Sequence, residues 1–67
     1  METLYFKKIL ELQKEKLRLE KALGIIINLQ GKKVVIEGEP VREFEALIVL
    51  EAMQFGFSAK KALELLK

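Results

Sequence analysis

The residue types that most often carry out catalysis or bind metals are scarce in this chain. It contains neither histidine nor cysteine, which removes the commonest general base, the commonest metal ligand and the thiolate nucleophile. Four glutamates near the middle of the chain remain as candidates: Glu37, Glu39, Glu43 and Glu45. Glu43 and Glu45 fall on different faces of a helix, while Glu39 and Glu43 suit the positive end of a helix dipole. No nucleophile, base and orienting group converge, so we predict no enzyme, no metal or cofactor and no small-molecule substrate.

The basic residues are the second group of candidates. Five of them, on the first predicted helix and at the predicted hairpin turn, are candidates for contacts to nucleic-acid phosphates: Lys14, Arg18, Lys21, Lys32 and Lys33. Glutamates interspersed along the same helix favour a solvated face with opposite-charge neighbours instead. Lysines at a hairpin tip also discourage edge-to-edge aggregation. The net charge of +2 permits nucleic-acid binding without requiring it.

The apolar content points to self-association. Hydrophobic residues make up 51% of a chain of only 67 residues, and a globule this small has too little interior to bury them all. Its core is also too small to be very stable alone. We therefore expect a homo-oligomer, with a dimer favoured. The aromatic residues Tyr5, Phe6, Phe55 and Phe57 are expected in the core or an interface rather than as platforms for stacked bases.

The N-terminal third of the chain predicts a helix. Helix-forming residues dominate from Thr3 to Leu23, and Gly24 is the first residue that would end the helix. Polar residues interrupt the apolar face near Gln13, so the alternative is two shorter segments that meet there. One continuous helix is the favoured interpretation.

The remainder predicts a β-hairpin followed by two helices. Two β-branched runs, Ile25–Leu29 and Lys33–Glu37, flank a turn that contains Gly31. Pro40 suits the first position of a helix that runs over Val41–Gln54, and Ser58 is a good N-cap for a last helix over Ala59–Leu66. The core stripe of the middle helix is expected to contain Phe44, Leu47, Ile48, Glu51 or Ala52, and Phe55.

These elements predict one α+β domain over residues 1–67, in the order α-β-β-α-α, with an antiparallel hairpin packed on helices. A lone hairpin is marginal, and its outer face carries Ile26 and Val35, so we expect a partner to cover or extend it. Apolar residues of the first helix are expected to share that interface. The candidate interface residues are Phe6, Ile9, Leu12, Leu19, Ile26 and Val35.

Two motifs resemble the C-terminal part of a KH domain. One is the strand V-x-I-x-G at Val34–Gly38, and the other is G-F-S-x-x-x-A-L-x-L-L at Gly56–Leu66. The resemblance covers roughly residues 14–67 and is to the KH domains of archaeal and eukaryotic small-subunit ribosome-biogenesis proteins. It implies RNA as a ligand and a three-stranded sheet. No two glycines of this chain have the G-x-x-G spacing with which KH domains clamp RNA, so the chain resembles a degenerate KH domain without its first strand, first helix and loop.

The sequence therefore favours a non-catalytic scaffold or protein-interaction module that self-associates through its N-terminal helix and hairpin. The alternative is an RNA-binding module that uses a basic surface formed on oligomerisation. A separate chain carrying the missing loop would make this one half of a split domain. Glutamate and lysine enrichment without aspartate suggests a hyperthermophilic, archaeal source, and the lack of a long apolar run predicts a cytoplasmic protein with no membrane partner.

Overall fold

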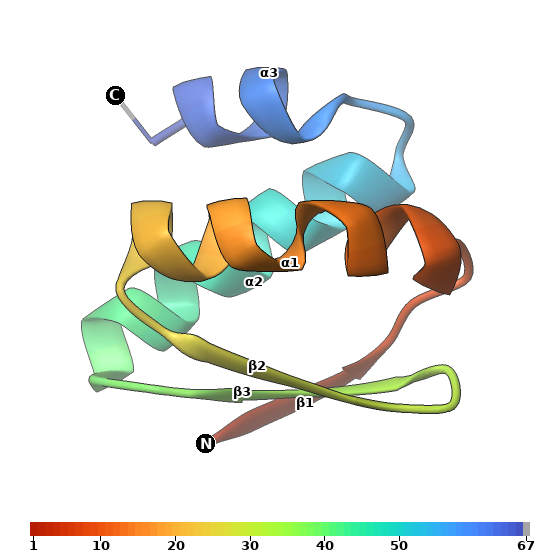
Figure 1. Ribbon diagram of the computed structural model, residues 1–67. Coiled ribbons are helices and arrows are strands. Elements are labelled where there is room, and N and C mark those ends of the chain that lie inside the picture. Colours follow the sequence, from red (N-terminus) through yellow and green to blue (C-terminus); the bar gives the residue numbers. More distant parts are fainter. Residues whose placement is uncertain (67) are drawn as a thin grey trace.

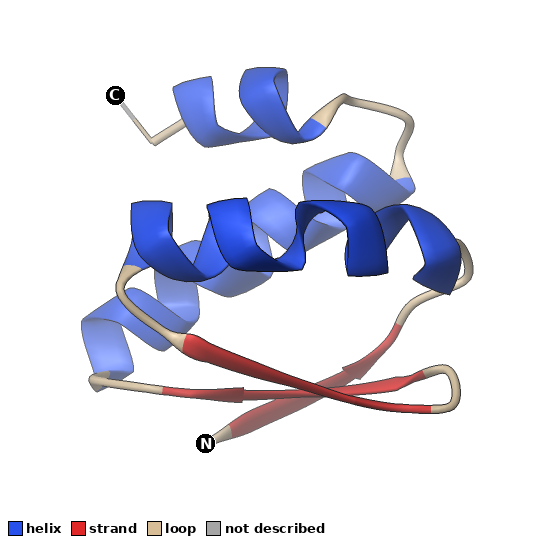
Figure 2. Ribbon diagram, viewed as in Figure 1, coloured by secondary structure: helices blue, strands red, loops and turns tan. Residues whose placement is uncertain are grey.

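The computed structural model describes residues 1–66, which form a three-stranded antiparallel sheet with three helices on one side (Figures 1 and 2). The α+β class, with a hairpin packed on helices, is confirmed. Helices α1 and α2 lie against one face of the sheet, and α3 packs on both helices away from the sheet. The elements are β1 (Glu2–Tyr5), α1 (Ile9–Leu23), β2 (Ile26–Gln30), β3 (Lys33–Glu37), α2 (Pro40–Gln54) and α3 (Ala59–Glu64).

The first strand corrects the helix expected from Thr3. β1 pairs antiparallel with β3, so that Thr3 lies opposite Val35, and the sheet order is β1-β3-β2. The element order is thus β-α-β-β-α-α, and the first helix begins only at Ile9. Threonine and aromatic residues suit a strand, and β1 gives partners to backbone groups that the hairpin alone would leave open at the edge of β3. The chain itself therefore supplies the extension of the hairpin that we expected from a partner.

The other predicted elements are confirmed, with small shifts at their ends. Both strands of the hairpin form, joined by a turn in which Gly31 has a φ of 62°. Gly24 ends α1 in the left-handed conformation, with a φ of 68°, as a C-terminal glycine does. The Ser58 hydroxyl accepts a hydrogen bond from the backbone N–H of Lys61, 3.3 Å away, and so caps the start of α3.

The core lies between the sheet and the helices. Alternation along the strands turns Ile27, Val34 and Ile36 toward the helices, and all three are completely buried. Phe6, which directly follows β1, is buried with them. The helices contribute the remaining large buried side chains, which are Leu12, Leu19 and Leu23 of α1 and Val49, Leu50 and Met53 of α2.

The face that α2 buries agrees only in part with the one predicted. Ala52 is buried as predicted, and Leu47 and Ile48 are half-buried. Phe44 and Phe55 are 64% and 88% exposed, while Ala46, Val49 and Leu50 face the core. A helix that is apolar on several sides has no single face specified by hydrophobicity alone. The small residue Ala46 lets the helix approach the core closely, where the much larger Phe44 would hold it away.

Candidate nucleic-acid interface

Pairing of β1 with β3 brings two separate lysine pairs to one end of the sheet. Tyr5 lies opposite Lys33 in the strand register, and the backbone N–H of Phe6 donates to the carbonyl oxygen of Lys32, 2.9 Å away. Lys7 and Lys8 directly follow Phe6. Because Phe6 is hydrogen-bonded to Lys32, these two lysines leave the sheet beside the hairpin turn. We call the resulting group the basic end, and it consists of Tyr5, Lys7, Lys8, Lys32 and Lys33.

The basic end is exposed, and its charges are not neutralised within the protomer. Tyr5 is 72% exposed and the four lysines are exposed as well. None of these lysines lies within 4.0 Å of a carboxylate in residues 1–66. The side-chain ion pairs of that part of the chain lie elsewhere, between Lys16 and Glu20 (3.8 Å), Arg18 and Glu15 (3.5 Å), and Arg42 and Glu45 (3.5 Å).

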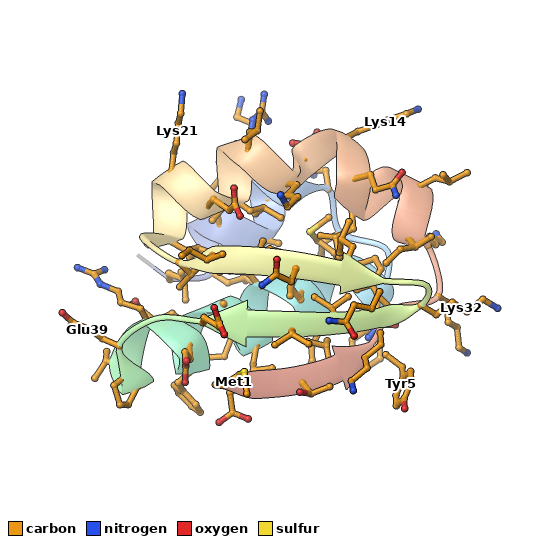
Figure 3. All side chains as sticks on the ribbon, turned by 60° about the horizontal axis from the view of Figure 1, so that its bottom comes forward. Met1, Tyr5, Lys14, Lys21, Lys32 and Glu39 are labelled. Carbon is orange, nitrogen blue, oxygen red and sulfur yellow. The ribbon has the colours of Figure 1, made fainter. Side chains whose placement is uncertain are left out.

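The opposite end of the sheet is rich in glutamate. Glu37 closes β3 at the end far from the hairpin turn, and Glu2 lies beside it in the register, opposite Ile36. Figure 3 shows Lys32 and Glu39 at opposite ends of the molecule. Although the net charge is only +2, positive and negative side chains are separated along the strands. An anion is therefore attracted to the basic end.

A second aromatic side chain lies next to the basic end. The backbone N–H of Lys7 donates to Oε1 of Gln54, 3.3 Å away, which fixes the start of the β1–α1 loop beside the end of α2. Lys7, Glu51, Gln54 and Phe55 line an open hollow of about 260 Å³ there. A flexible ligand that contacts Tyr5 and Lys7 can therefore reach Phe55 as well.

Comparisons of the chain with protein-family models, curated proteins and solved structures find no match. No helix within residues 1–66 is long and apolar enough to cross a membrane. The same residues contain no group of three carboxylates placed to hold a metal ion. The surface features of the fold are thus the basis for assigning a function.

The five residues predicted to contact nucleic acid occupy three places. Lys32 and Lys33 belong to the basic end. Lys14 and Lys21 project from α1 away from the sheet (Figure 3), while Arg18 pairs with Glu15 and lines an open groove of about 490 Å³ between α1 and α3. Sequence analysis did not place Tyr5, Lys7 and Lys8 beside the hairpin turn, because the expected helix from Thr3 would have placed them on a different element from the hairpin.

The predicted interface residues do not form one surface. Phe6, Leu12 and Leu19 are buried in the core of the protomer, so a partner cannot contact them, and this part of the prediction is wrong. Ile9 and Val35 are half-buried, and Ile26 is exposed on the outer face of the sheet. Of the aromatic residues expected in the core or an interface, Phe6 lies in the core, while Tyr5, Phe55 and Phe57 are exposed on the protomer.

Glu43 lies near the glutamate-rich end of the sheet, where its side chain holds two parts of the fold together. Its side chain is buried, and its Oε2 atom lies 2.9 Å from the amino nitrogen of Met1 and accepts a hydrogen bond from the backbone N–H of Gly38, also 2.9 Å away. The hydrogen bond from the Met1 amino group lowers the pKa of Glu43 below its ordinary 4.5, against the opposing effect of burial and with help from Gly38. The carboxylate thereby ties the start of β1 to α2.

We expect this carboxylate to make folding stability depend on acid pH. Because the pKa of Glu43 is lower in the folded protein, its stabilising contribution is complete above pH 4.5 and is lost as the pH falls through the folded-state pKa. Glu43→Gln should reduce stability at pH 7 and flatten the decline in melting temperature below pH 4.5, as measured by circular dichroism. Glu45→Gln is the matched control, and an equally flattened profile for that variant would contradict the assignment.

Proposed function

We propose that this chain is a non-catalytic RNA-binding module that holds single-stranded RNA at its basic end. The observation behind the proposal is the convergence of four exposed lysines from two separate segments, none of which forms an ion pair within residues 1–66. Glu51 lines the hollow beside Lys7 without pairing with it. Gathering like charges costs electrostatic free energy. A phosphate backbone offsets that cost, and the release of its counterions favours binding.

The neighbouring side chains suit a single strand better than a duplex. Tyr5 presents its ring beside Lys33, and Gln30 follows in the same row across the three strands. A base can stack on the Tyr5 ring while the lysines contact flanking phosphates, which is the usual combination in proteins that bind single strands. Stacking of this kind tolerates every base, so we expect little sequence preference.

The resemblance to KH domains supports RNA as the ligand. That resemblance implies a three-stranded sheet, and this chain has a sheet of three strands in the order β1-β3-β2. The G-x-x-G loop is absent from the sequence, so the basic end, instead of that loop, would contact the phosphates. The proposal also differs from the sequence-based alternative in that the basic surface exists within one protomer.

Fluorescence anisotropy with a labelled single-stranded oligouridine tests the proposal. The double variant Lys32→Glu/Lys33→Glu should weaken binding about tenfold or more, because it removes two positive charges that face phosphates and adds repulsion. The slope of log affinity against log salt should also become shallower, by about 0.7 for each phosphate that the variant no longer neutralises. Tyr5→Ala should cost about 1–3 kcal/mol of binding free energy, because the base would have no ring to stack on.

The matched control is Lys60→Glu/Lys61→Glu, which makes the same change of charge at exposed positions of α3. The affinity of this control variant for the oligouridine should remain within about twofold of the wild-type affinity at high salt, where long-range charge effects are screened. Equal losses for the two double variants would show that only net charge matters and would contradict a site at the basic end. Absence of binding at low salt would reject the function, and tighter binding to DNA of the same sequence would reject RNA as its ligand.

A further inference from the structure

Helix α2 presents an apolar stripe that nothing within residues 1–66 covers. We call it the α2 stripe, and it consists of Val41, Phe44, Ile48 and Phe55. Successive spacings of three, four and seven residues place all four on one helix face. Val41, Phe44 and Phe55 are among the most exposed large apolar residues of the protein, and Ile48 between them is half-buried. The exposed Glu51 lies between Ile48 and Phe55 on this face, so the continuous apolar part runs from Val41 to Ile48. An exposed apolar surface of this kind typically marks a contact surface.

Strand β1 runs alongside α2 and leaves one edge open. Two contacts fix their relative position, because the Met1 amino group contacts Glu43 at the start of α2 and the backbone N–H of Lys7 donates to Gln54 at its end. One edge of β1 pairs with β3, and no strand within residues 1–66 pairs with the other. The α2 stripe and the open edge therefore belong to the same side of the molecule.

The two edges of the sheet are protected to different degrees. On the outer edge of β2, Oε2 of Glu20 accepts a hydrogen bond from the backbone N–H of Ile27, 2.8 Å away. This contact occupies a donor that another strand would need and places a carboxylate over the edge. The structure shows no side-chain hydrogen bond of this kind to the backbone of Glu2–Tyr5. Of the two edges, that of β1 is the one available for pairing.

We infer that a second copy of this chain covers this side, as a dimer in which β1 pairs antiparallel with β1 of the copy. A twofold axis perpendicular to the sheet relates two antiparallel strands and keeps the helices of both copies on the same face. Because α2 runs alongside β1, the same axis brings the two α2 stripes together in antiparallel orientation. The same twofold rotation thus gives hydrogen-bond partners to the open edge of β1 and buries the apolar stripe.

The distribution of charge favours a copy of this chain over an unrelated partner. Glu2 and Glu39 lie near the start of β1 and α2, whereas Lys7 and Lys8 lie near their ends. Antiparallel pairing places the acidic start of each copy beside the basic end of the other, so that opposite charges meet twice. Lys32 and Lys33 belong to the turn of the adjacent hairpin and lie outside this contact. The dimer contact therefore shares Lys7 and Lys8 with the proposed RNA site and leaves Lys32 and Lys33 free for phosphates.

Analytical ultracentrifugation of the protein without nucleic acid tests the inference. The wild type should sediment as a dimer, at twice the protomer mass of 7.7 kDa, at concentrations in the range of tens of micromolar. Phe44→Glu should weaken association about 100-fold, because it places a charge within the continuous apolar part of the stripe. Leu17→Glu is the matched control, since Leu17 is an equally exposed leucine on α1, and it should leave the dimer intact.

Circular dichroism shows whether Phe44→Glu and Leu17→Glu are folded. Both variants should retain the helical spectrum of the wild type. A wild type that sediments as a monomer would overturn the inference. Dissociation by Leu17→Glu to the same extent as by Phe44→Glu would do so too, because it would place the interface on α1. Loss of RNA binding with an intact dimer would count against the proposed function and leave this inference standing.

Cross-linking tests the orientation of the two copies. The chain has no cysteine, so a single introduced cysteine reports on one position. Ile48 lies midway along the stripe and hence beside the twofold axis, so Ile48→Cys should form a disulfide-linked dimer under mild oxidation. Lys21→Cys, on the outward side of α1, should remain a monomer on a non-reducing gel. Equal cross-linking of both variants would contradict the antiparallel arrangement.

Discussion

Replacing Phe6 with alanine should remove a large part of the stability of the folded protein. Phe6 is completely buried between the sheet and the helices, and removing a buried phenylalanine costs about 3–5 kcal/mol. A domain of 67 residues has a total stability of roughly 3–10 kcal/mol at the usual free energy per residue. The variant should therefore lose from about a third to all of its stability in a urea titration followed by circular dichroism.

Tyr5→Ala is the matched control because Tyr5 is the preceding residue but points to the other face of the sheet. It should reduce the free energy of unfolding by less than about 1 kcal/mol, mainly because alanine has a lower β-propensity. In the helix expected from Thr3, both side chains would lie on the apolar face and both variants would be costly. Similar losses for Tyr5→Ala and Phe6→Ala would thus support the helix and contradict β1.

The start of the chain shows why local propensity was insufficient. The run Thr3-Leu4-Tyr5-Phe6 contains neither glycine nor proline, and the helix-forming residues after it made a single helix the simplest interpretation. The competing signal was weak, since alternation of Leu4 and Phe6 with Thr3 and Tyr5 spans only four residues. Pairing with β3 decides the conformation, and that partner lies about thirty residues further along the sequence.

Helix α2 shows a different limit. Its existence and its bounds followed from Pro40 and the glycine after Phe55, but the direction of its core face did not. Phe44 was expected inside as part of an apolar stripe, whereas Ala46, Val49 and Leu50 are the residues buried. The packing of α2 against the rest of the core therefore decides which of its apolar residues remain exposed, and that packing cannot be read from the helix sequence alone.

Half of the candidate site could be predicted from the sequence. The other half could not, because its position depends on β1, which was predicted as part of a helix. Lys32 and Lys33 stood out as a charged hairpin turn, and they belong to the basic end. Lys7 and Lys8 joined them only because β1 carries the chain to that turn. Once β1 was taken for part of a helix, these lysines had no predicted neighbour on the hairpin, and the small net charge gave no hint that the charges are separated in space.

A buried charge on α1 should have the largest effect of any substitution considered. Leu19 is 0% exposed and Leu17, on the same helix, is 70% exposed. Leu19→Glu should cost at least the approximately 2–5 kcal/mol of a buried leucine-to-alanine change, because the carboxylate must also be removed from water. We expect the helical circular dichroism signal of Leu19→Glu to be largely lost at pH 7 and partly recovered at pH 4, where the side chain is protonated.

Leu17→Glu should stay within about 0.5 kcal/mol of the wild type, as surface substitutions usually do, so the pair of variants separates two roles for α1. If α1 were the self-association surface that sequence analysis favoured, Leu19→Glu would yield a folded monomer. If α1 instead contributes Leu19 to the core of each protomer, the same variant unfolds at every protein concentration. A folded, monomeric Leu19→Glu protein would therefore overturn the core described above and return the interface to the first helix.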